Sequence, residues 1–228
     1  MRLVATAVAV ALLSAPAHAV IVFSDNFDAE NGGATALNYV GFANWTVLDG
    51  TVDLIASGFV GVACRGGAGS CVDLDGSSFD AGALAANDSF SFDVGDAVEV
   101  LGWISGNQRG GSDDVGMLLE FADPTDLSAS GVYINGVFID LGGGAGVSTF
   151  DFSDLLGAAA PFALWGVTFT AAEAGSFRFA FFNRSGDNVG AILDDVSVSI
   201  TPDDPVPAPA ALALFGLGLV ALGAARRR

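Results

Sequence analysis

Apolar residues in the middle of this chain recur at every second position, and this spacing constrains the fold more than any other feature. Phe90, Phe92 and Val94 alternate with Ser and Asp, and a similar alternation runs through 177–181 and 196–200. A period of two indicates strands that bury one face, whereas a helix needs a period of 3.6. Further strand candidates, bounded by Gly, Asp and Asn, are 21–23, 45–48, 52–56, 97–105, 115–121, 132–141, 147–152 and 164–170.

Helical patterns are weak in the same region. The one helical candidate, 154–160, is short and rich in Gly and Ala. About ten short strands without a strong amphipathic helix favour an antiparallel sandwich or jelly roll. We therefore predict an all-β domain, an antiparallel β-sandwich of the jelly-roll type, over residues 20–201.

Charge excludes several classes of protein. The chain has 26 acidic residues against eight basic ones, all of them Arg, and a formal net charge of -18. Such a chain has no basic surface for nucleic acid. A hydrophobic fraction of 52% also excludes a wholly disordered acidic chain. The length of 228 residues suits one domain with appendages.

The first 19 residues have the layout of a secretory signal peptide. Arg2 precedes an uncharged apolar run at 3–13, and Ala17-His18-Ala19 fits the small-x-small cleavage pattern. We expect the secretion machinery to export the chain and cleavage to follow Ala19; the alternative is a buried N-terminal helix. His18 is the single His, and the chain has no Lys. The mature protein would then have no Ser-His-Asp triad, no Cys-His pair and no lysine Schiff base.

The C-terminus has three parts in series. A Pro-rich linker at 202–209 leads into an uncharged apolar run at 210–225, which ends at Arg226, Arg227 and Arg228. Sixteen helical residues span about 24 Å, and the flanking residues bring this close to the thickness of a membrane. We expect 210–228 to form a hydrophobic anchor helix with its Arg cluster on the cytoplasmic side; the alternative is a core helix.

This tail resembles the PEP-CTERM sorting domain of exported bacterial proteins. Val206, Pro207, Ala208 and Pro209 match its Pro-x-Pro signature, with Ala208 in place of the Glu that names the motif, and the apolar run and Arg cluster follow. The resemblance implies an exosortase-type protease that cuts near Pro-x-Pro. It also implies anchoring in the inner membrane before processing, followed by sorting to the cell surface or extracellular matrix of an exopolysaccharide-producing bacterium.

The body is similar to the galactose-binding-like jelly rolls of carbohydrate-binding modules. The motifs that carry this similarity occur in order at 21–30, 44–46, 50–55, 72–77, 106–111 and 190–198. It implies no established enzymatic activity.

In such modules a structural calcium often ties the first strand region to the last. By this resemblance, calcium ligands are expected at Asp25, Asp28, Glu30, Asp194 and Asp195, in clusters whose short acidic side chains suit a hard cation. Alternation places Asp194 on the core side of its strand and Asp195 on the opposite side. The alternative is that these acids cap turns and keep the surface soluble.

Two other segments contain residues that could bind a ligand. Asp73-Leu74-Asp75-Gly76 matches half of an EF-hand loop, but Ser77 and Leu84 occupy positions five and twelve, so we interpret it as a strand end turning at Gly76. Arg109 lies in a Gly-rich loop and could bind sugar hydroxyls or uronates. Alternatively it offsets neighbouring acids such as 113–114.

Aromatic and cysteine residues complete the candidates. Tyr39 lies in a Gly- and Asn-bearing loop as a candidate exposed ring for a sugar, while Trp45, Trp103 and Trp165 lie in strand patterns typical of a core. Cys64 and Cys71 bracket a short Gly-rich loop, and export would allow a disulfide between them.

Three functional hypotheses follow. The first is a non-enzymatic, surface-sorted protein that binds or organises exopolysaccharide. The second is a structural or adhesive matrix protein without specific glycan binding. The third is a carboxylate-based glycan hydrolase, although no pair among the 26 acids stands out as its acid and base.

Overall fold

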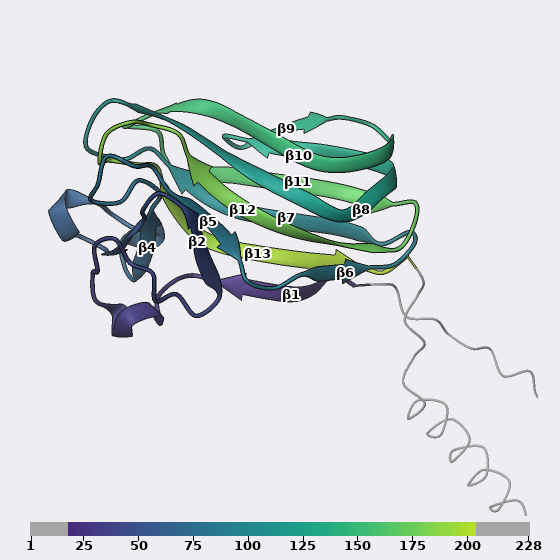
Figure 1. Ribbon diagram of the computed structural model, residues 1–228, viewed down its shortest axis with the longest axis horizontal. Helices are drawn as coiled ribbons and strands as arrows, with labels where there is room; N and C mark the ends of the chain where they lie inside the picture. The colour runs from purple at the N-terminus through teal and green to yellow at the C-terminus, as the bar shows by residue number, and fades with distance from the viewer. Residues whose placement is uncertain (1–17, 204–228) are drawn as a thin grey trace, which may run out of the picture.

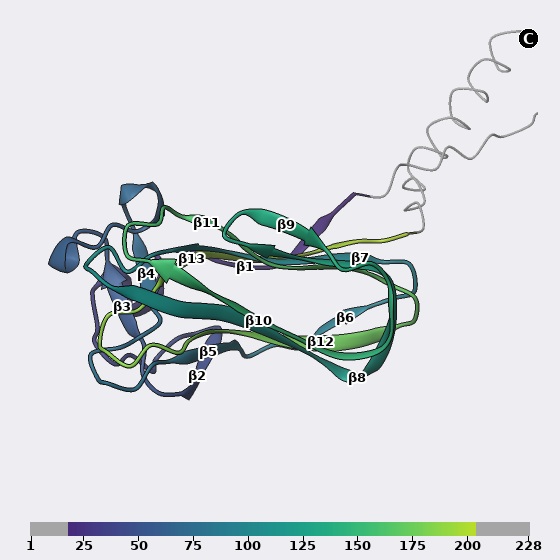
Figure 2. The same cartoon turned by 90° about the horizontal axis from the view of Figure 1, so that it is seen from above.

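Strand β8 (Ser112–Ile134) runs through both layers of the structure and links them. In this computed structural model, which describes residues 18–203, the first half of β8 pairs with β12 in one sheet and its second half pairs with β11 in the other. Figure 2 shows the two layers edge-on, one above the other. All the strand pairs between named strands are antiparallel, which confirms the predicted all-β jelly-roll sandwich.

Each layer has a clear strand order (Figure 1). The first contains β2, β5, β12, the first half of β8 and β10, with β6 beside β12. The second contains β9, the second half of β8, β11, β7, β13, β4 and β3, with β1 along β13. The remaining bounds are β1 Val20–Asp25, β2 Trp45–Asp49, β3 Asp53–Ala56, β4 Ser70–Asp73, β5 Ala83–Ala86, β6 Phe90–Phe92, β7 Ala97–Ser105, β9 Val137–Asp140, β10 Gly144–Gly157, β11 Ala163–Ala171, β12 Gly175–Asn183 and β13 Ile192–Thr201, with 3-10 turns η1 Glu30–Gly33, η2 Phe59–Gly61 and η3 Arg65–Gly67.

The core between the layers is largely aromatic. Phe177 and Phe179 point inward from β12, and the ring of Phe169 from the opposite layer meets Phe177 edge-on with centroids 5.8 Å apart. Such pairs contribute about 0.5–1.5 kcal/mol each beyond burial. Trp45 and Trp165 are fully buried as expected, whereas Trp103 is half-buried.

Two expected elements differ from the structure. The run 132–141 is a hairpin rather than one strand, because Asn135 and Gly136 both take positive φ and turn the chain into β9. An Asn-Gly pair with these angles is the usual two-residue hairpin turn. The helical candidate at 154–160 is instead the end of β10 followed by a turn.

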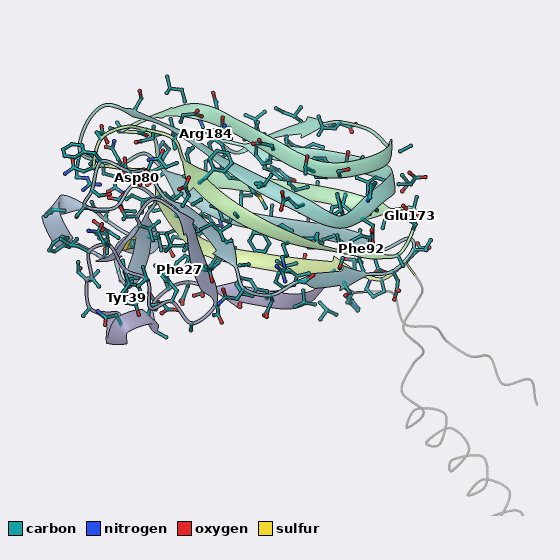
Figure 3. The ribbon with its side chains drawn as sticks, in the orientation of Figure 1. Phe27, Tyr39, Asp80, Phe92, Glu173 and Arg184 are labelled. Atoms are coloured by element: carbon teal, nitrogen blue, oxygen red, sulfur yellow. A yellow bond between two sulfur atoms is a disulfide. The ribbon has the colours of Figure 1, made fainter. Side chains whose placement is uncertain are left out.

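The two ends of the sandwich differ in character. Val20 of β1 lies opposite Ile200 of β13, so both ends of the described chain leave from the same pole. The opposite pole, here called the loop pole, gathers the loops 57–69, 74–82, 106–111 and 184–191, which contact one another. In Figure 3, Asp80 marks the loop pole and Glu173 the other end.

The terminal segments lie largely outside residues 18–203. No helix within residues 18–203 is long and apolar enough to cross a membrane. The expected anchor helix at 210–228 lies outside the described residues, as does the expected signal peptide apart from His18 and Ala19.

Candidate functional site

The outer face of the first layer presents a pair of opposite charges that face solvent. Arg178 of β12 lies directly across from Glu120 of β8, and both side chains are exposed. Alternation explains this, because the neighbours Phe177 and Phe179 point into the core. Neither charged side chain makes a hydrogen bond or ion pair with any residue among 18–203. Their polar atoms are therefore free to contact a ligand.

Two adjoining hollows meet at this pair. The first has a volume of about 250 Å³ and the second a volume of about 300 Å³, and Glu120 and Arg178 line both of them. We call their combined surface the outer-face groove. It is lined by Thr46, Leu48, Ala85, Ala86, Asn87, Ser89, Leu118, Glu120, Phe121, Ala122, Phe177, Arg178, Phe179 and Ala180. Several of these are small residues, which leave room beside the charged pair.

Sequence reasoning missed this groove, although half of its signal was present. The period-two pattern of 177–181 places Arg178 on the face opposite to the phenylalanines. The pairing of Arg178 with Glu120 needs the strand order and register, which join residues 58 positions apart and are not encoded in either strand alone.

Arg109, a sequence candidate for ligand binding, lines a separate hollow of about 600 Å³ at the loop pole. Its guanidinium donates to the buried carboxylate of Asp73, rather than to the acids at 113–114. Nearby, the amide of Gln108 is held by the backbone of Ala63 through two hydrogen bonds of 2.8 and 2.9 Å. The polar groups of this hollow are therefore mostly paired within the chain.

Tyr39 is half-buried rather than exposed. Its hydroxyl donates to the carbonyl of Gly41 at 3.0 Å, and its ring packs against Phe42 with centroids 4.7 Å apart. Tyr39 is absent from the lining of the hollow that contains Arg109, so the two candidate ligand-binding residues do not share that site.

The expected calcium ligands near the N-terminus receive N–H donors. Asp25 accepts from the indole of Trp45 and the amide of Asn44, both at 2.9 Å. Asp28 accepts from the backbone of Ser70 at 2.7 Å, and buried Glu30 accepts from the backbone of Ala43 at 2.9 Å. These contacts join distant segments, whereas the alternative expected the acids to cap local turns at the surface, and calcium at these residues stays a prediction.

Asp194 and Asp195 also have protein partners. Buried Asp194 accepts from the backbone of Arg65 at 2.9 Å, and the Arg65 guanidinium pairs with Asp195 at 2.5 Å. Burial raises the pKa of Asp194 to about 7, against the lowering effect of its backbone donors. The same guanidinium stacks over Trp103, 3.9 Å from the ring centroid.

Cysteine sulfurs lie beside Asp194. Cys64 and Cys71 are joined by a disulfide, with their Cα atoms 5.5 Å apart. Within residues 18–203, these two and Asp194 are the only three His, Cys, Asp or Glu side chains whose ligand atoms all come within 4.8 Å of each other. Because both sulfurs are in the disulfide, this group offers one carboxylate rather than a thiolate metal site.

Comparison with known proteins adds information chiefly at the C-terminus. The model of the PEP-CTERM protein-sorting motif matches residues 205–228, so the chain ends in a PEP-CTERM sorting motif, as the sequence predicted. The chain thereby falls in the class of proteins that carry this sorting signal. No curated protein matches.

Two solved structures share a partial likeness. The first contains the CBM22-1 and GH10 modules of endo-1,4-beta-D-xylanase 10B of Clostridium thermocellum complexed with xylohexaose, at 16% identity and a TM-score of 0.41. The second is the CBM22-1 xylan-binding domain of Xyn10C of Paenibacillus barcinonensis, at 11% identity and the same score. The likeness covers 83% of this chain, 30% of the first structure and 98% of the second. At these scores it does not extend to function.

Proposed function

We propose that this is an exported, surface-sorted protein whose β-sandwich binds a glycan without catalysis and helps to organise exopolysaccharide outside the cell. Export and sorting to the cell surface are supported by the sorting motif at 205–228. The binding is supported by one observation above all, the solvent-facing pair of Arg178 and Glu120 in the outer-face groove. A guanidinium supplies several donors in a fixed plane and a carboxylate supplies acceptors, so together they suit adjacent sugar hydroxyls.

The chemistry of the groove favours a neutral glycan. The net charge of -18 repels polysaccharides rich in uronate. The aromatic residues that line the groove, Phe121, Phe177 and Phe179, are buried at 8%, 1% and 2% exposure, so they offer no open ring for stacking on a sugar. We therefore expect weak binding at each site, which many copies on one surface would strengthen.

A glycan array with the full-length protein tests the proposal. We expect retention on one or more neutral polysaccharides and at least a tenfold loss of it in Arg178→Ala and Glu120→Gln. Arg184→Ala is the matched control, because Arg184 already pairs with Asp151 at 3.3 Å. Equal retention by Arg178→Ala and the wild type would show that the outer-face groove is not the glycan-binding site. Release of reducing ends from any bound polysaccharide would favour the hydrolase hypothesis instead.

The alternative function, a structural or adhesive matrix protein, has its own supporting observation. Strand β9 exposes three apolar residues in a row, Val137, Phe138 and Ile139, at 62%, 48% and 42%. Exposed apolar surface of this kind often marks protein contacts. If β9 is such a contact, Val137→Thr with Ile139→Thr should reduce self-association in sedimentation velocity while leaving glycan retention unchanged.

The same proposal names the partners of the tail. The secretion machinery would export the chain, and the apolar run at 210–225 would hold it in the inner membrane until an exosortase-type protease processes it near Pro207 and Pro209. The product would then reach the cell surface or matrix. Co-expression with and without the protease, followed by mass determination of the released chain, tests this order.

A further inference from the structure

The loop pole buries a group of acidic side chains behind the hollow that Arg109 lines. Asp73 at the end of β4, Asp75 just beyond it and Asp113 at the start of β8 are each 0% exposed. Asp53 of the adjacent β3 is 2% exposed. Burying a carboxylate is costly unless donors or a cation replace the water it loses, so each of these groups needs a partner.

Most buried acids in residues 18–203 have such partners. Asp73 accepts from the backbones of Asp75 and Gly190 and from Arg109. Both oxygens of Asp113 are taken, one by Ser185 at 2.8 Å and the other by Asn107 at 2.9 Å. Asp53 and Asp194 likewise accept at both oxygens.

Asp75 is different, because neither of its two oxygens has a hydrogen-bond partner in this part of the chain. Its surroundings make the ionised form still less favourable. Burial raises the pKa of Asp75 to about 7, and the charges of Asp73, Asp187, Asp113 and Asp53 add to the rise. Arg109 is the cation of this cluster, and its ion pair is with Asp73. The surroundings of Asp75 therefore have excess negative charge, and both of its carboxylate oxygens are without a donor in residues 18–203.

We propose that Asp75 is the central ligand of a divalent-cation site of the calcium type at the loop pole, which Asp187 completes from the 184–191 loop. A hard cation takes six to eight oxygen ligands from carboxylates, amide and backbone carbonyls and water. One carboxylate that binds through both oxygens and a second from a loop are enough acidic ligands for such a site. The cation would neutralise the charge that four neighbouring carboxylates impose.

The packing of the loop supports the role of Asp187. A Cβ at Gly190 would lie 2.3 Å from the backbone nitrogen of Asp75, so only glycine lets this loop pack directly against that residue. Asp187 is exposed, and one of its oxygens accepts from the backbone of Val189 at 3.0 Å. The other oxygen has no donor within residues 18–203 and is available to a cation that enters from solvent.

This site is separate from the calcium ligands that the sequence suggested. Asp25, Asp28 and Asp194 accept from N–H groups of other segments, which a cation would have to displace. Within residues 18–203, Asp75 has no such donor to lose. The proposal also does not depend on glycan binding, since the outer-face groove contains none of these residues.

Calcium titration of the full-length protein in detergent, after removal of divalent ions with EGTA, tests the site. We expect calcium at 100-fold its Kd to raise the melting temperature by roughly 5 °C or more. Asp75→Asn should abolish this response, whereas Asp80→Asn, an exposed acid in the same loop, should keep it. A wild-type protein that does not respond, or an Asp75→Asn variant that responds normally, overturns the proposal.

Two further variants keep the test decisive. If Asp75→Asn does not fold, Asp187→Asn changes an exposed side chain and should weaken calcium binding at least tenfold in isothermal titration calorimetry. Unchanged affinity in that variant would also overturn the proposal. Asp28→Asn tests the other location, and loss of the response there with retention in Asp187→Asn would assign calcium to the N-terminal cluster instead.

Discussion

The guanidinium of Arg109, on the loop after β7, forms an ion pair with the carboxylate of Asp73, which is completely buried at the end of β4. The arginine side chain remains 25% exposed, so it caps the buried acid from the solvent side. Arg109, which the sequence suggested for ligand binding, thus has a structural partner 36 positions away.

Replacing Arg109 by Met should destabilise the fold by about 3 kcal/mol at pH 9, because it leaves a buried charge without its partner. Burial raises the pKa of Asp73 to about 7 and Arg109 lowers it, so the loss should shrink at pH 5, where Asp73 is protonated. Urea unfolding at both pH values measures this. Arg184→Met is the control, since its pair with Asp151 is half-exposed and should contribute under 1 kcal/mol. Equal losses in the two variants would contradict the expectation.

Stability in the absence of divalent ions should fall as the pH rises from about 4 to about 7. The pKa of Asp194 is raised by burial to about 7 in the folded state, so the native protein holds a proton that the unfolded chain has already lost. Each such group contributes a slope of at most about 1.4 kcal/mol per pH unit. Asp194→Asn should flatten part of this slope in urea unfolding, and Asp88→Asn, at an exposed position, should not. A free energy of unfolding that rises between pH 4 and pH 7 would contradict this prediction.

Removing the disulfide should cost about 2.5 kcal/mol, the loop-closure estimate for a ring of this size. The double variant Cys64→Ser with Cys71→Ser, compared with the wild type under oxidising conditions, gives the value by chemical unfolding. Reduced wild type serves as the control and should match the variant. A variant as stable as the oxidised wild type would show that the bond adds nothing to folding.

Changing Arg226, Arg227 and Arg228 to Gln should disturb surface sorting, because the matched motif ends in this cluster. Cell fractionation should then find the protein in fractions other than those of the wild type. Arg184→Gln is a matched control, because it removes an exposed arginine outside the outer-face groove and leaves the tail intact. Unchanged surface localisation of the triple variant would show that the arginine cluster is not needed for sorting.

Much of the fold could be predicted from period-two alternation. The expected strand at 97–105 has the same bounds as β7, and the alternating runs at 177–181 and 196–200 lie within β12 and β13. Strand β5 was missed because four residues are too few to establish a period, and β4, which is buried at every position, was recognised only as a strand end that turns at Gly76. The Asn135-Gly136 turn had a recognisable signal in the sequence that the apolar run around it concealed.

The candidate sites were less predictable for a different reason. Asp75 and Asp187 are 112 positions apart, and the packing of Gly190 against Asp75, together with the hydrogen bond from Gly190 to Asp73, brings their loops together. The motif Asp73-Leu74-Asp75-Gly76 does not fit an EF-hand, and a local motif contains no information about ligands that the strand topology brings in from distant segments. Burial of a charged group depends on the assembled sandwich. The amino-acid composition therefore does not reveal that the oxygens of Asp75 lack donors.

The pairing of Val20 with Ile200 also places both ends of the described chain at one pole, which has a consequence for a surface-held copy. Since the segment that carries the sorting motif continues from the pole of that pairing, the opposite end is the most distant part of the body from the tether. A copy held by its tail would therefore extend its loops outward into the medium, where extracellular calcium is encountered first. The outer-face groove would run along the flank between the two ends, open to chains that pass between neighbouring copies.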